Sequence, residues 1–131
     1  MIGLDTNVLV RYVAQDDQDQ SAQASMLIET LTPEQPGLIT LVSAVELVWV
    51  LQSCYRSSKA EIVGVLEMIL RTKELVVENA EIVWQALRRY SDSNADFADC
   101  LIERSAHAAG CGYTVTFDSK AAKSAGMRHL T

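Results

Sequence analysis

Short apolar segments alternate with longer segments whose apolar residues recur at helical spacing, and this alternation constrains the fold more than any other feature. Strands are predicted at residues 2–5, 38–40, 74–78 and 113–117. Helices are predicted between and after them, at residues 8–13, 16–31, 43–52, 58–70, 79–90 and 96–109. This alternation is typical of an α/β sandwich with a mostly parallel sheet. No repeat, low-complexity run or domain boundary interrupts it, so residues 1–131 are expected to form a single domain.

Length and composition narrow the class of protein further. A chain of 131 residues with 49% hydrophobic content can bury an ordinary core. No stretch approaches the apolar length needed to cross a bilayer, and the N-terminus lacks a basic segment leading into an apolar one. We therefore expect no membrane association, a mature protein beginning near Met1, and a cytoplasmic location. The odd number of cysteines, without zinc-binding spacing, predicts buried free thiols at Cys54, Cys100 and Cys111.

The charge balance excludes one mode of nucleic-acid binding. The formal net charge is −6, and phosphate binding by bulk electrostatics depends on an excess of Lys and Arg. The same charge is compatible with a nuclease whose metal ions offset it locally, or with a protein that associates with a basic partner.

Five acidic residues lie where this fold would place strand ends or helix starts: Asp5, Glu46, Asp96, Asp99 and Asp118. Each has an ordinary structural explanation, such as a helix cap, a capping box of Ser43 with Glu46 or of Ser93 with Asp96, or a turn at Asp118. Taken together they favour a cluster, because the carboxyl edge of a parallel sheet is where such folds bind ligands. Glu46 and Asp99 also interrupt apolar helical segments, where an unpaired carboxylate is costly to bury. A cluster of carboxylates without matching bases predicts a Mg²⁺ or Mn²⁺ site.

Four segments that contain these acids resemble the PIN domain, specifically the VapC-type toxin ribonucleases of bacterial toxin–antitoxin systems. They are LDTNVL at residues 4–9, SAVEL at 43–47, NADFADCLI at 94–102 and TFD at 116–118. The opening DTNVL is short, but the order and spacing of all four segments fit the family. The resemblance covers the whole chain.

The resemblance implies a PIN-like three-layer α/β/α sandwich and a Mg²⁺- or Mn²⁺-dependent endoribonuclease. Asp5, Glu46, Asp99 and Asp118 match the four acids of the family, and Asp96 is a further acid. The metal ligands would be Asp5 and Asp99, completed by Asp96 and Asp118, although the sequence leaves open whether Asp96 or Asp99 is the primary ligand. Its expected partners are an RNA substrate, a cognate antitoxin protein and a second copy of the chain in a homodimer.

Roles for the neighbouring side chains follow from this hypothesis. Glu46 could hold a metal-bound water or act as general base. Side chains beside the acids could orient them, with helix capping as the alternative; these are Thr6, Asn7, Ser43 and Thr116. Basic residues after the first and last expected strands are candidates for substrate contacts, with solvated surface as the alternative; these are Arg11, Lys120, Lys123 and Arg128.

Two other functions are alternatives to a nuclease, and the acidic residues of the chain distinguish them. A haloacid-dehalogenase-type phosphatase needs a second aspartate two residues after the first, where this chain has Asn7. A catalytically silent PIN-fold module that binds RNA or protein would not need the acids, all of which are present.

The remaining conspicuous side chains are expected to be structural. His107 and His129 have no partner at ligand spacing, and Trp49, Trp84 and Tyr90 are expected in the core or an interface. A domain of this size cannot bury every large apolar residue on its helices, so an association surface is expected among Tyr12, Met26, Ile28, Trp49, Met68 and Trp84.

Overall fold

The computed structural model describes all residues, 1–131, as two compact units, Met1–Glu78 and Asn79–Thr131. The first unit contains β1 (Ile2–Gly3), α1 (Thr6–Ala14), α2 (Gln18–Glu29), β2 (Gly37–Ile39), α3 (Leu41–Ser53), α4 (Lys59–Arg71) and β3 (Leu75–Val77). The second contains α5 (Ala80–Asp92), α6 (Phe97–Ala108), β4 (Val115–Thr116), α7 (Ser119–Ser124) and β5 (Arg128–His129). The expectation of a single domain stays a prediction.

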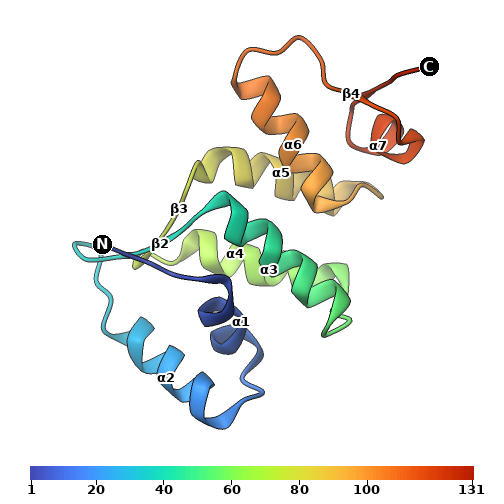
Figure 1. Ribbon diagram of the computed structural model, residues 1–131. Helices are drawn as coiled ribbons and strands as arrows, with labels where there is room; N and C mark the ends of the chain where they lie inside the picture. The colour runs from blue at the N-terminus through green and yellow to red at the C-terminus, as the bar shows by residue number, and fades with distance from the viewer. The chain divides into compact units, whose positions relative to one another are not determined.

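The first unit is built on a three-stranded parallel sheet in the order β1-β2-β3, and the ribbon of Figure 1 labels β2 and β3 side by side. Its register pairs Gly3 with Leu38 and Leu38 with Val76. Because the strands are parallel and each is followed by a helix, the chain leaves β1 into α1 and β2 into α3 at the same edge of the sheet. That edge carries the first two acidic positions.

The helices of the first unit begin at side-chain caps. Asp5, Asp17, Thr40 and Ser58 each accept a hydrogen bond from a backbone N–H of the first turn, which satisfies a donor that has no partner within the helix. Ser58 forms a complete capping box with Glu61. The hydrogen bond that the Ser58 backbone N–H donates to the Glu61 carboxylate lowers the pKa of Glu61. These caps set the direction in which each helix leaves the preceding strand or loop.

The second unit is a helical hairpin followed by a small parallel strand pair. α5 packs against α6, where the rings of Tyr90 and Phe97 meet edge to face with centroids 5.9 Å apart. β4 pairs in parallel with β5, and α7 connects them (Figure 1). Gly110 ends the α6 segment at φ 99°, as expected of a helix stop, and Gly126 turns the chain after α7 at φ 79°.

The predicted α/β class with parallel strands is confirmed, and most predicted elements are present. Two were not predicted: α7 and β5, which are six and two residues long and so carry little periodicity. Two capping predictions were wrong: Thr40, not Ser43, is the N-cap of α3, and Asp96 is itself the N-cap of α6. Asn79 is the N-cap of α5, at the residue where this helix was expected to begin, in a left-handed conformation without a side-chain hydrogen bond.

The burial of cysteines and aromatic residues corrects other predictions. Only Cys100 is buried, whereas Cys54 and Cys111 are exposed free thiols. Tyr90 is buried as expected, but Trp49 is 62% exposed and is not a core residue. Of the apolar residues proposed for an association surface, Met26, Trp49 and Met68 are exposed and Ile28 is buried. No helix combines the length and apolar character needed to cross a bilayer.

Candidate active site

In the first unit, Asp5 and Glu46 are linked through Thr6. Asp5 caps α1 directly after β1, and its Oδ1 accepts a 2.9 Å hydrogen bond from the Thr6 backbone N–H. The Thr6 hydroxyl donates a 2.7 Å hydrogen bond to Oε1 of Glu46 on α3. One buried threonine therefore contacts both acids, and it orients the Glu46 side chain as the sequence suggested.

Ser43 takes part in the same group from a buried position. Its hydroxyl oxygen lies 3.3 Å from the Thr6 hydroxyl, and its backbone N–H donates to Thr40 at 3.1 Å. The predicted capping box of Ser43 with Glu46 is wrong, because α3 begins two residues earlier and leaves Glu46 free to face Thr6. Glu46 itself is exposed, so the cost of burying a carboxylate does not apply to it.

In the second unit, Asp96, Asp99 and Asp118 form a second acidic set. Asp96 is the N-cap of α6, Asp99 lies in the first turn of that helix, and Asp118 is the N-cap of α7. Partial burial raises the pKa of the Asp99 carboxyl, and the charges of Asp96 and Asp118 raise it further, whereas the ammonium of Lys120 opposes them. The surroundings of Asp99 thus disfavour its ionised form.

Neighbouring groups hold the other two acids of this set. Lys120 forms a 3.3 Å ion pair with Oδ1 of Asp96 on the surface. Asp118 accepts a 2.8 Å hydrogen bond from the Lys120 backbone N–H, and its own N–H donates to the Thr116 hydroxyl at 3.0 Å. Thr116 therefore positions the backbone at Asp118, and the Lys120 side chain pairs with an acid of the candidate site.

The chemistry of these side chains fits a hard divalent cation. Every candidate ligand is a carboxylate, and Mg²⁺ and Mn²⁺ prefer oxygen ligands. The mutual repulsion that raises the pKa of Asp99 is the kind that a bound cation offsets. No group of three or more His, Cys, Asp or Glu side chains lies close enough to form a metal site in the structure. The structure thus brings together Asp5 with Glu46, and Asp96 with Asp99 and Asp118, as two sets in two units.

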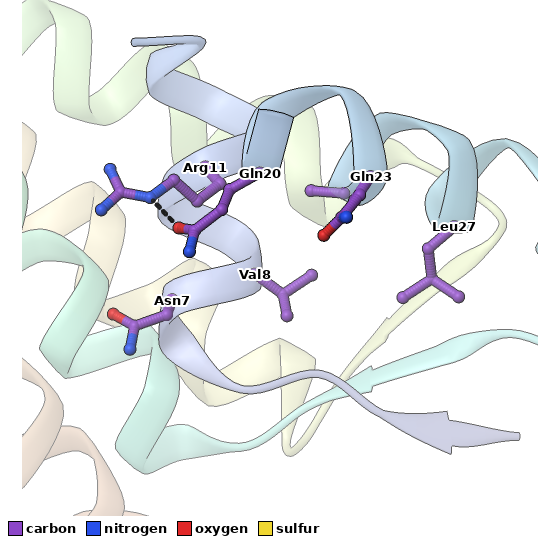
Figure 2. Close-up of a pocket in the computed structure, with 7 residues that line it drawn as sticks. Asn7, Val8, Arg11, Gln20, Gln23 and Leu27 are labelled. Atoms are coloured by element: carbon purple, nitrogen blue, oxygen red, sulfur yellow. Dashed lines mark hydrogen bonds between the residues drawn. The ribbon is translucent and has the colours of Figure 1, made fainter. Parts of the chain in front are cut away.

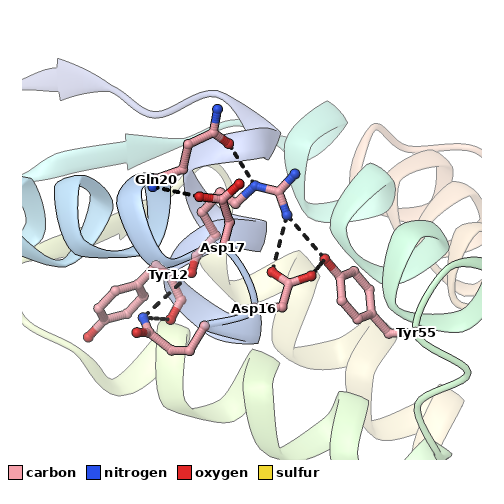
Figure 3. Close-up of polar contacts among 7 residues, drawn as sticks. Tyr12, Asp16, Asp17, Gln20 and Tyr55 are labelled. Carbon is pink, nitrogen blue, oxygen red and sulfur yellow. Dashed lines mark hydrogen bonds and ion pairs between the residues drawn. The ribbon is translucent and has the colours of Figure 1, made fainter.

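Arg11, a candidate substrate contact, is held by three side chains. Its Nε donates to Gln20 Oε1 at 2.8 Å, and its Nη1 donates to Asp16 at 3.1 Å and to the Tyr55 hydroxyl at 3.3 Å. Tyr55 in turn donates a 2.7 Å hydrogen bond to the other oxygen of Asp16, as Figure 3 shows. These contacts fix the guanidinium on the surface of α1. The sequence predicted a role for Arg11 but not for Tyr55, because Tyr55 is 44 residues away and no sequence pattern relates the two residues.

A pocket of about 350 Å³ lies between α1 and α2 beside Arg11. Its lining combines the apolar side chains of Val8 and Leu27 with the amides of Asn7, Gln20 and Gln23, which are drawn in Figure 2. Asn7 therefore borders a pocket two residues from Asp5. The sequence predicted Asn7 only as a residue that could orient the acids, and no pattern in the sequence predicted the glutamines of α2 as part of a pocket.

The other predicted residues of the second unit have separate roles. The Arg128 guanidinium lies 3.7 Å above the centre of the Tyr113 ring, and His129 Nε2 lies 3.1 Å from the Phe117 carbonyl oxygen. His107 is exposed on α6, and Lys123 is exposed in the last turn of α7. Neither histidine contacts an acid of the candidate site, in keeping with the structural roles expected for them.

The fold is mixed α/β, and Asp5 and Asp118 cap helices that follow strands, whereas Asp96 and Asp99 lie at the start of α6 after helix α5. A model of the PIN domain family matches residues 2–126. The chain therefore belongs to the PIN domain family, whose members are typically metal-dependent nucleases, and the PIN-like α/β/α fold class agrees with the parallel strands and seven helices observed. No curated protein matches the chain.

Proposed function

We propose that this chain is a Mg²⁺- or Mn²⁺-dependent endoribonuclease that hydrolyses RNA phosphodiester bonds. The observation that carries the proposal is the raised pKa of Asp99 beside Asp96 and Asp118, in a chain matched by the PIN domain family over residues 2–126. Burial is the largest cause of that rise, and the charges of Asp96 and Asp118 add to it; the part due to repulsion is unfavourable in the free protein and is relieved by a cation.

The proposed metal ligands are Asp5, Asp96, Asp99 and Asp118. A bound divalent ion supplies Lewis-acid polarisation of the phosphate and lowers the pKa of a water molecule. The proposed general base is Glu46. Its Oε1 accepts the Thr6 hydrogen bond, which leaves Oε2 to take the proton of the attacking water while the phosphorus–oxygen bond to the leaving ribose breaks. Arg11, held by Gln20, Asp16 and Tyr55, is a proposed contact to the RNA backbone.

Cleavage of single-stranded RNA tests this proposal. Asp5→Asn and Asp99→Asn should each lower Mn²⁺-dependent cleavage on the order of a hundredfold or more, because an amide keeps the shape of the side chain but removes the charge a hard cation needs. Glu34→Gln is the matched control, since it removes one exposed carboxylate outside both acidic sets. Near-full, metal-dependent activity in either Asp variant would remove that residue from the site. RNA binding without cleavage by the unmodified chain would favour the catalytically silent alternative.

We further propose that the chain is the toxin of a type II toxin–antitoxin pair, of the VapC type, and acts in the cytoplasm. The acidic net charge supports a partner segment that carries a basic residue, and the exposed side chains of Met26, Trp49 and Met68 support an apolar association surface. The proposed assembly is a homodimer that also binds the antitoxin.

Three measurements test the toxin hypothesis. Expression of the chain should arrest bacterial growth, and Asp5→Asn or Asp99→Asn should abolish the arrest at equal protein levels. Sedimentation should give a dimer, and a monomer at high protein concentration would contradict the homodimer. Co-expression with an antitoxin that restores growth but leaves Mn²⁺ affinity unchanged would contradict direct occupation of the acids.

A further inference from the structure

The α5–α6 hairpin carries a concentration of arginines that the nuclease chemistry does not use. A pocket of about 350 Å³ there is lined by Gln85, Arg88, Arg89, Asp92 and Arg104. The whole chain has 11 Lys and Arg residues against 17 Asp and Glu, so three of its 11 cations lie in this one pocket. The lining groups carry three positive charges and one negative charge, in a protein whose net charge is −6.

Arg104 is fixed in this pocket by the residue that precedes it. Its Nε and Nη2 donate to the two carboxylate oxygens of Glu103 at 2.7 and 3.1 Å, and both side chains are partly buried. This forked pairing leaves Nη1 with no acceptor in the protein, so one edge of a rigid guanidinium remains available. The Glu103 carboxylate raises the pKa of Arg104, which therefore stays charged.

Arg89 is positioned by the turn that follows α7. A Cβ atom added to Gly126 would lie 3.2 Å from Nη1 of Arg89, so the guanidinium lies flat against this glycine. Gly126 has a φ of 79°, a conformation that side-chain-bearing residues rarely adopt. Arg88 is exposed on the same helix, and neither Arg88 nor Arg89 forms an ion pair within the protein, although Asp92 lies in the same pocket.

We infer that this arginine pocket, defined by Arg88, Arg89 and Arg104, binds phosphodiester groups of single-stranded RNA away from the bond that is cut. Guanidinium groups match phosphate oxygens in pairs, and the Gln85 amide can donate to a ribose or base oxygen beside them. An acidic chain has to hold a polyanion through local cations, and this pocket gathers three of the 11 Lys and Arg residues of the chain. The inference rests on the proposed function, because an endoribonuclease is expected to bind RNA at this pocket and not an acidic protein segment.

RNA binding in EDTA tests the inference separately from catalysis. A labelled single-stranded oligonucleotide is titrated with the unmodified chain, Arg88→Gln, Arg104→Lys and the double variant, and anisotropy is followed over a range of salt concentrations. Arg104→Lys keeps the charge beside Glu103 but removes the forked geometry, so the fold is spared. Arg71→Gln is the matched control, because Arg71 is 69% exposed on α4 and lies outside the arginine pocket.

Arg88→Gln should weaken binding on the order of tenfold, alike for different RNA sequences, and reduce the slope of log K against log salt by about 0.7, the value for one phosphate contact on a single strand. Arg104→Lys should weaken binding with little change in slope, and Arg71→Gln should change neither. Unchanged RNA affinity in both pocket variants, or no binding by the unmodified chain, would overturn the inference. Loss of binding to polyglutamate with unchanged RNA binding would instead assign the pocket to an acidic protein. A chain that binds RNA through these arginines but never cleaves it would refute the nuclease proposal and leave this one standing.

Discussion

The Thr6 hydroxyl donates a 2.7 Å hydrogen bond to Oε1 of Glu46, which joins the first turn of α1 to α3 across 40 residues of sequence. Thr6 is buried and Glu46 is exposed, so the bond restricts a carboxylate that would otherwise move freely in solvent. The same residue donates its backbone N–H to Asp5. Thr6 is therefore a positioning residue for both acids of the first unit.

Substitution Thr6→Val should lower the rate of RNA cleavage by about tenfold or more, because a hydrogen bond to a charged group contributes roughly 1.5–3 kcal/mol. Valine keeps the shape and the backbone N–H but removes the hydroxyl donor. The loss should appear in kcat, with KM little changed. Thr6→Ser, which keeps the hydroxyl, should recover most of the activity, and equal rates for the valine and serine variants would remove Thr6 from this role.

Two glycine-to-alanine substitutions in the first unit should have opposite effects on stability. A Cβ at Gly37 in β2 would lie 2.7 Å from Leu4 Cδ1 and 3.0 Å from Leu31 Cδ1, and both leucines are buried, so Gly37→Ala should cost about 1–3 kcal/mol. Gly64 is exposed within α4 with no atom near its added Cβ, so Gly64→Ala should stabilise by roughly 0.5–1 kcal/mol. Chemical denaturation of both variants measures the difference. The same sign for both would contradict this account of the packing.

The sequence predicted the fold class well because periodicity reports long elements. The segment 43–52 is continuous enough to be read as the helix Leu41–Ser53, and the parallel strands follow from its alternation with strands. α7 and β5 could not be read in this way, since six residues and two residues define no period. Their existence depends on the pairing of β5 with β4, a contact that no local pattern encodes.

The sequence predicted the acidic residues of the candidate site but not all of the contacts that position them. Asp5, Asp96 and Asp118 are N-cap residues in the structure, so the simple structural explanation and the functional one apply to the same side chains. For Asp5 and Asp118 the two explanations coincide because each caps a helix that directly follows a strand, whereas Asp96 caps a helix that follows another helix. The burial argument held for Asp99 and failed for Glu46, because the apolar neighbours of Glu46 face other sides of α3.

Tyr55→Phe should flatten both the acid and the alkaline ends of the pH–stability profile. The Tyr55 hydroxyl and Arg11 lower the pKa of Asp16 below 3.8, so this stability is present above the ordinary pKa and is lost as pH falls through the lowered one. The hydrogen bond to Asp16 raises the pKa of Tyr55 above 10.0, so its contribution is present below pH 10.0 and is lost as pH rises through the raised value. Denaturation midpoints across pH check both arms. Tyr12→Phe is a control outside the network, and an unchanged profile in Tyr55→Phe would contradict the coupling.

Asp99→Asn should raise the melting temperature of the metal-free protein. The pKa of Asp99 is raised by burial and by the charges of Asp96 and Asp118, so its contribution to stability is fully present below the ordinary pKa of 3.8 and is lost as pH rises through the raised value. At neutral pH the ionised group is therefore destabilising, and removing its charge should help the fold while it harms function.

Mn²⁺ should reverse the order of the melting temperatures of the unmodified chain and Asp99→Asn. A cation that binds the folded protein at a hundred times its Kd adds about 2.7 kcal/mol to the free energy of unfolding, so the melting temperature of the unmodified chain should rise with Mn²⁺. Asp99→Asn should respond far less, because it lacks one of the proposed ligands, whereas Glu34→Gln should respond like the unmodified chain. Melting curves with and without Mn²⁺ measure both effects. A metal-free Asp99→Asn variant that melts below the unmodified chain would refute the repulsion argument, and a melting curve insensitive to Mn²⁺ in the unmodified chain would refute the metal site itself.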